Sequence, residues 1–155
     1  MNEELSPIIR AFEVQCPVEH AFDTWTRRID LWWPLAGHSV SRDNAASVAI
    51  EPRRGGRIYE TTRSGNEIVW GTVNAWEPPN RFGYLWHIGE SDASQATQVT
   101  IMFTALGSAR TRIAIEHTGW ERAGPKAASR RRGNLRGWEG LEAAFVQFTN
   151  AEAAT

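Results

Sequence analysis

Alternating apolar and polar residues dominate the middle of the chain, a period that is typical of β-strands. Clusters of Gly, Pro, Asn and Ser separate most of the alternating stretches and predict turns between them. Such a run of short strands joined by tight turns favours one antiparallel sheet of six or seven strands. The stretches are residues 8–16, 46–51, 56–62, 67–76, 81–89, 97–105 and 110–118.

Side chains point to opposite faces at successive positions of a strand, so each of the last three strands has an apolar side. Another element has to cover these apolar sides and shield them from water. In the order of the chain they are formed by Phe82, Tyr84, Trp86 and Ile88, then Val99, Ile101 and Phe103, then Ile113, Ile115 and His117.

Apolar residues with a helical period follow the first strand and the last strand. Residues 18–29 place Phe22, Trp25 and Ile29 on one face, and Pro17 suits the first helical position. A short helical turn follows in DLWWPLAG, residues 30–37. Near the C-terminus we expect a helix close to 134–149, with Trp138, Leu141, Phe145 and Phe148 on its apolar face.

This order of elements predicts an α+β fold, in which the sheet curves around the long C-terminal helix. We expect one domain over residues 1–155, with its core in residues 8–149. One helix face cannot cover the whole sheet, so the arrangement leaves room for a cavity lined by aromatic side chains.

Composition narrows the possible functions. The eight Trp residues among 155 are an unusual concentration of aromatic surface. The net charge of −1 gives no field to attract nucleic acid or an anionic membrane. No signal pattern and no apolar run long enough for a membrane span occurs, and Cys16 is the single cysteine. We therefore expect a soluble, cytoplasmic protein, monomeric or homodimeric, that binds neither nucleic acid nor membrane.

The segments WGTVNAWEPPNRFGYLW, TQVTIMFTALGSARTRIAIEHTGW and GWEGLEAAF resemble the SRPBCC or START-like superfamily. More narrowly they resemble its branch related to activators of the ATPase of the 90-kDa heat-shock chaperone, and VEHAFDTWTRRIDLWWP is similar to the first-helix segment of bacterial members. The resemblance covers residues 8–149 and implies a helix-grip fold, with two short helices after the first strand. Members bind lipids, hormones or polyketides, act as cyclases, or assist the chaperone; they share no common set of catalytic residues.

The sequence contains few signals for catalysis. Its four His and one Cys show no zinc-binding spacing, so we expect no metal and no cofactor. The Gly-Gly turn in RRGGR, residues 53–57, lacks the spacing of a phosphate loop. We interpret Cys16 as a small buried side chain.

Two polar residues of the predicted strands have alternative interpretations. His117 lies on an apolar strand face, where it is either a hydrogen-bonded core histidine or a general base in a cavity. Glu60 is either a solvated carboxylate of a hairpin or a polar group inside the sheet. Because its face is not settled by the pattern, the solvated position is the expected one.

Residues 120–138 carry Arg122, Lys126, Arg130, Arg131, Arg132 and Arg136 and only one acid, Glu121. We expect a solvated loop over the mouth of the cavity, and the alternative is a lid that recognises an anionic ligand.

These observations favour a protein that binds an apolar or aromatic small molecule between sheet and helix. The alternatives are a co-chaperone that activates the 90-kDa heat-shock-protein ATPase and a cyclase-type enzyme that uses His117 or Glu60. No catalytic residue is assigned. The expected ligand-binding residues are Trp33, Tyr84, Trp86, Phe103, His117 and Trp138.

Overall fold

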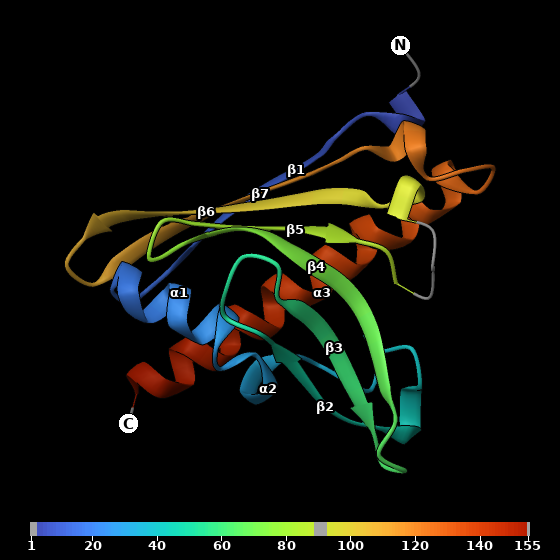
Figure 1. Ribbon diagram of the computed structural model, residues 1–155. Coiled ribbons are helices and arrows are strands. Elements are labelled where there is room, and N and C mark those ends of the chain that lie inside the picture. The colour runs from blue at the N-terminus through green and yellow to red at the C-terminus, as the bar shows by residue number, and fades with distance from the viewer. Residues whose placement is uncertain (1–2, 89–92, 155) are drawn as a thin grey trace.

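The computed structural model describes residues 3–88 and 93–154. Seven antiparallel strands form one sheet in the order β1-β7-β6-β5-β4-β3-β2. The strands curve around one long helix, α3 (Figure 1). Their bounds are β1 Ile8–Val14, β2 Ala45–Ile50, β3 Arg57–Thr62, β4 Glu67–Glu77, β5 Arg81–Trp86, β6 Thr97–Gly107 and β7 Arg110–Thr118.

The strands follow the predicted pattern closely, and the helix-grip α+β architecture is confirmed. The apolar sides of β5, β6 and β7 face the interior, as strand parity predicts. Cross-strand pairing places Tyr84 opposite Val99, and Val99 opposite His117, so these three side chains form one row across the inner face. The predicted end of β5 at residue 89 lies outside the described residues.

The two short helices predicted after the first strand, over 18–29 and within 30–37, are confirmed as α1 Val18–Thr26 and α2 Ile29–Trp32. Pro17 precedes α1 as its N-cap, and its carbonyl accepts a hydrogen bond from the Ala21 N–H at 2.9 Å. The change of direction between the helices allows Trp32 to pack on Trp25, with ring centroids 4.6 Å apart. A single straight helix would carry the two rings along one axis and away from each other.

Helix α3, Ala127–Ala153, begins seven residues before the predicted start at 134. The prediction of a loop over residues 120–138 is therefore wrong for its second half. Ala and Arg favour helix, so the segment continues the helix although it lacks an apolar face. Between Ala127 and Trp138 no residue is buried, whereas Trp138, Leu141, Phe145 and Thr149 are buried against the rest of the protein.

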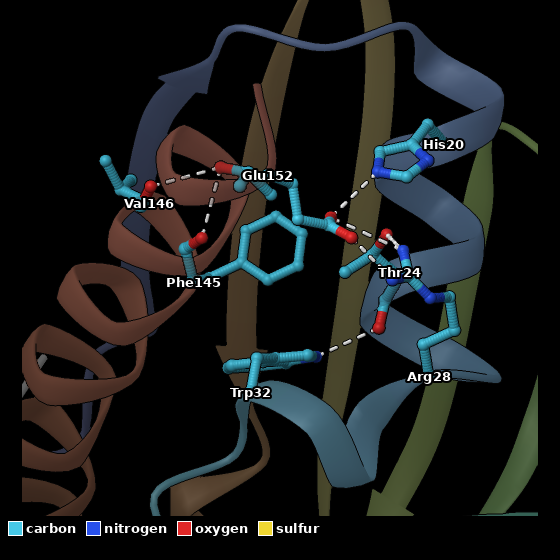
Figure 2. A network of polar contacts seen from close by, with 8 residues as sticks. His20, Thr24, Arg28, Trp32, Phe145, Val146 and Glu152 are labelled. Carbon is cyan, nitrogen blue, oxygen red and sulfur yellow. Dashed lines mark hydrogen bonds and ion pairs between the residues drawn. The ribbon is translucent and has the colours of Figure 1, made fainter. Parts of the chain in front are cut away.

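The C-terminal end of α3 is fixed to α1 and the turn that follows it (Figure 2). The Glu152 carboxylate accepts a hydrogen bond from Arg28 Nη2 at 2.5 Å and contacts His20 Nε2 at 3.0 Å. Arg28 also donates to the Thr24 hydroxyl at 2.9 Å. This contact closes the core at one end of the helix, and the other end borders the pocket described next.

Candidate ligand pocket

A pocket of about 240 Å³ lies between the inner face of the sheet and the N-terminal half of α3. It is larger than the cavity of about 150 Å³ that holds benzene, and smaller than the roughly 300 Å³ at which sites for drug-sized ligands begin. The volume suits a compact molecule of one or a few rings. Its wall is formed by Trp33, Gly37, His38, Ser39, Tyr84, Trp86, Ile88, His117, Gly133, Asn134, Gly137, Trp138 and Leu141.

Two glycines of α3 form the helical side of the wall. A Cβ atom at Gly133 or Gly137 would meet no heavy atom within 4 Å, so neither glycine is required by a close neighbour. Glycine inside a helix costs about 0.8–1.0 kcal/mol relative to alanine. The two residues lower the stability of α3 and leave the space next to it open.

Aromatic rings form the opposite side. Trp33 follows α2, and Trp86 ends β5. Both contact the buried ring of Trp70, at centroid distances of 5.3 Å and 5.9 Å, so a fixed core residue supports the wall from behind. On the helical side, beside the two glycines, Trp138 of α3 contributes a third indole. Flat apolar walls of this kind favour a flat apolar ligand.

His117 is buried in the wall, and both of its ring nitrogens have partners. The Trp138 indole N–H donates to Nδ1 at 3.0 Å, and Nε2 lies 2.7 Å from the Thr97 hydroxyl. Indole can only donate, so Nδ1 carries no proton and the Nε2–H donates to Thr97. Burial, with the nearby charge of Arg130, lowers the pKa of His117 to about 3. The neutral ring has its lone pair engaged by Trp138, a geometry that suits a structural histidine better than a general base.

Tyr84 lies in the same row as His117, with Val99 between them, and is only 5% exposed. Burial raises the pKa of its phenol above the ordinary value, which keeps the group neutral. Within the described part of the chain its hydroxyl has no hydrogen-bond partner. Besides the pocket, Tyr84 borders a void of about 10 Å³, at the lower limit of the space for one water molecule.

The loop after α2 covers the pocket and is held by one buried carboxylate, Glu60 of β3. Its oxygens accept from the Val40 N–H at 2.6 Å, from the Ser41 N–H at 3.1 Å and from the Ser41 hydroxyl. The Trp70 indole N–H donates to the same group at 2.8 Å. Burial alone would raise the pKa of Glu60, but these hydrogen bonds outweigh it and hold the pKa below its ordinary value.

Glu60 is fully buried, so the expected solvated position is wrong. The alternation of β3 allowed either face. The deciding partners, Val40 and Ser41, come from a distant loop that the strand pattern does not describe.

The family model for Activator of Hsp90 ATPase homolog 1-like protein matches residues 15–146, most of the chain. The chain belongs to this family. No curated protein sequence matches the chain significantly.

Solved structures agree with the assignment to the AHSA1-like family. An anthrahydroquino-gamma-pyrone synthase, Txn09, is 31% identical, with a TM-score of 0.61 over 94% of this chain and 90% of that chain. CalC from Micromonospora echinospora, described as a self-sacrificing resistance protein, is 25% identical, with a TM-score of 0.72 over 97% of each chain. NE0264 from Nitrosomonas europaea, 16% identical with a TM-score of 0.70 over the full length of both chains, shares the fold.

In this AHSA1-like protein five of the six expected ligand-binding residues come together in one wall: Trp33, Tyr84, Trp86, His117 and Trp138. Phe103 does not belong to the pocket. Its ring packs against Phe22 and Trp25 in the core, at centroid distances of 5.2 Å and 6.5 Å. Strand parity gives the inner face correctly but does not tell which part of that face α1 covers.

Sequence reasoning missed His38 and the two pocket glycines. The backbone of α3 approaches His38 at Gly140, where a Cβ atom would lie 3.0 Å from the ring Nε2. Nδ1 of His38 is buried without a partner among the described residues. The available signal was three glycines, at 133, 137 and 140, in the predicted helix and directly before it.

Other candidate chemistry of the AHSA1-like chain has no geometric support. Cys16 is buried, and burial raises the pKa of its thiol to about 11, which disfavours the reactive thiolate. Across residues 3–88 and 93–154, no cluster of three or more His, Cys, Asp or Glu could hold a metal ion. No helix in that part of the chain is long and apolar enough to cross a membrane.

Proposed function

We propose that this protein binds an apolar or aromatic small molecule in the pocket between the sheet and α3. The observation that carries the proposal is the pair Gly133 and Gly137, which keeps one wall open at the expense of helix stability. The indoles of Trp33 and Trp86 on the opposite wall, with that of Trp138 on α3, supply the apolar contact area.

The relatives support a ligand of this class. The synthase Txn09 and the resistance protein CalC share the fold along nearly the whole chain, and the name of Txn09 refers to a polycyclic aromatic product. We infer a related chemical class for this chain, held as cargo or as a sensed compound. The protein would act in the cytoplasm, as a monomer or homodimer, consistent with its single buried thiol.

A neutral fluorescent probe, N-phenyl-1-naphthylamine, tests the proposal. We expect saturable enhancement of its fluorescence with the wild-type protein and a loss of at least tenfold in affinity for Gly137→Leu, whose side chain fills the pocket. Ala143→Leu adds the same group at an exposed position of the same helix and serves as the matched control. Absence of wild-type binding, or equal affinity of both variants, would contradict the proposal.

The family description favours a second function, activation of the ATPase of a heat-shock chaperone of the Hsp90 type. A coupled ATPase assay with the chaperone from the same host tests it. Stimulation that Gly137→Leu leaves intact would mean that this function does not use the pocket.

A cyclase-type activity is the third candidate, favoured by the likeness to a synthase. It requires a proton-transfer group other than His117, and turnover of an aromatic polyketide substrate would be its direct test.

A further inference from the structure

Most polar atoms in the pocket wall are already used by the protein itself. The Trp33 indole N–H donates to the His38 carbonyl at 2.8 Å, and the Trp138 indole N–H donates to His117. The Ser39 hydroxyl donates to the Leu35 carbonyl at 2.6 Å. These groups shape the wall, but their protons are not available to a ligand.

Besides Nδ1 of His38, two neighbouring donors of the wall remain unused. Among the described residues, neither the Tyr84 hydroxyl nor the Trp86 indole N–H has a hydrogen-bond acceptor. The two side chains lie on the same face of β5, with ring centroids 5.7 Å apart. Neither group is sealed inside the protein, because His38 Nδ1 is the one fully buried side-chain atom without a partner among the described residues. Both donors are therefore open to an acceptor that a ligand in the pocket supplies.

Among the residues that the structure describes, the wall carries no carboxylate, lysine or arginine that would hold an ionic ligand. Arg130 is near enough to influence His117, but its guanidinium donates to the Ala123 carbonyl at 3.1 Å. An anion or a cation would lose its hydration in the pocket without gaining an ion pair.

We propose that the pocket recognises an uncharged aromatic molecule through an oxygen on its ring system, which accepts hydrogen bonds from the Tyr84 hydroxyl and the Trp86 indole N–H. Phenols and aryl ketones have this chemistry. The inference rests on the proposed function, because it names the ligand class of the same pocket.

Displacement of N-phenyl-1-naphthylamine by three matched compounds tests the inference. Naphthalene has the ring alone, 1-naphthol adds a neutral oxygen, and 1-naphthoate adds a charge. We expect the wild-type protein to bind 1-naphthol roughly 3- to 10-fold more tightly than naphthalene, the gain of one or two neutral hydrogen bonds. We expect 1-naphthoate to bind most weakly of the three.

Tyr84→Phe keeps the ring and removes the hydroxyl. It should abolish most of the preference for 1-naphthol and leave the affinity for naphthalene unchanged. Trp86→Phe should act in the same direction. Tyr59→Phe is the matched control, because Tyr59 is the other tyrosine of the chain and packs against Arg57 outside the pocket. It should retain the wild-type preference.

The outcomes separate the two proposals. If the wild-type protein binds the probe but prefers naphthalene or 1-naphthoate, the oxygen-recognition inference is wrong and the pocket remains. The same conclusion follows if Tyr84→Phe weakens naphthalene and 1-naphthol equally. If neither the probe nor any of the three compounds binds, the proposed function itself fails.

Discussion

Glu60 illustrates at the residue scale how one carboxylate organises a pocket. It is buried on β3 and accepts hydrogen bonds from two backbone N–H groups of the covering loop and from Trp70. Trp70 in turn supports Trp33 and Trp86. Loop and aromatic wall therefore depend on the same group.

Glu60→Gln removes the charge and turns one acceptor oxygen into a donor. Hydrogen bonds to charged groups contribute about 1.5–3 kcal/mol each, so we expect a loss of roughly 2–3 kcal/mol in urea unfolding. The exposed Glu116→Gln on β7 should change stability by less than about 0.5 kcal/mol. Equal small effects of both variants would mean that the loop is held by other contacts.

His117 makes the free energy of unfolding depend on pH. Its folded-state pKa of about 3 lies below the ordinary value of about 6.5, so between these values the unfolded chain binds more protons. The stabilisation is complete above pH 6.5 and is lost as the pH falls towards 3, by up to about 1.4 kcal/mol per pH unit. Glu60, with its lowered pKa, adds a loss in the same direction at lower pH.

His117→Gln removes this titration while keeping a polar side chain in the wall. Urea unfolding at pH 7.5, 6.5, 5.5 and 5.0 should give a flatter dependence for the variant than for wild type. A wild-type slope retained in the variant would show that His117 is not the group responsible.

At the scale of elements, α3 is divided into two halves with different tasks. The C-terminal half packs Leu141, Phe145 and Thr149 into the core, and the N-terminal half presents Gly133 and Gly137 to the pocket. The period of apolar residues predicts the C-terminal half well. The N-terminal half has no such period, because glycines stand where it faces the pocket, and the start of the helix was therefore predicted too late.

Gly137→Ala should separate stability from function. Alanine favours the helix by about 0.8–1.0 kcal/mol and its Cβ would meet no neighbour, so the melting temperature should rise by about 2–4 °C. The affinity for N-phenyl-1-naphthylamine should fall at the same time. Gly140→Ala is the comparison, since its Cβ would lie 3.0 Å from His38 and the gain should be smaller. A variant of Gly137 that is less stable would contradict this role of the glycine.

At the scale of the whole molecule, the core and the pocket wall are both aromatic and differ in how completely they are packed. Phe145 is fully buried and contacts the rings of Phe12, Trp25 and Trp32. Trp86 is half-buried and opens onto the pocket on one side. A ring with an open side has fewer contacts to lose.

Phe145→Ala should therefore lower the free energy of unfolding by about 3–5 kcal/mol, the range for a truncated core aromatic. Trp86→Leu should cost only about 1–2 kcal/mol and change probe affinity several-fold, because it loses fewer contacts. Denaturant unfolding with probe titration of both variants measures the difference. A loss for Trp86→Leu as large as that for Phe145→Ala would assign Trp86 to the core.

The sequence was sufficient for the fold and for four residues of the wall, because strand parity and helix period both report which side chains face inward. Trp33, the fifth, was expected from its place before Pro34, where folds of the resembled family open. The sequence was insufficient where the outcome depends on tertiary contacts. Phe103 lies under α1 and not in the pocket, and Glu60 is buried by a loop distant in sequence. His38 reaches the pocket through the same loop, beside a glycine of α3.

The contact of Glu152 with Arg28 fixes the C-terminal end of α3, and it bears on how fast the amides of the helix exchange with solvent. The N-terminal half is held by polar contacts such as that of Arg131 with the Ser6 carbonyl at 2.6 Å, and no residue between Ala127 and Trp138 is buried. Amide hydrogen exchange should therefore be slow after Trp138 and faster before it. A ligand that binds only the folded wall suppresses the local opening that exchange requires, by mass action. A ligand in the pocket should therefore slow the amide hydrogen exchange of residues 128–137. The amides after Trp138 should change little, because their exchange already requires nearly global unfolding.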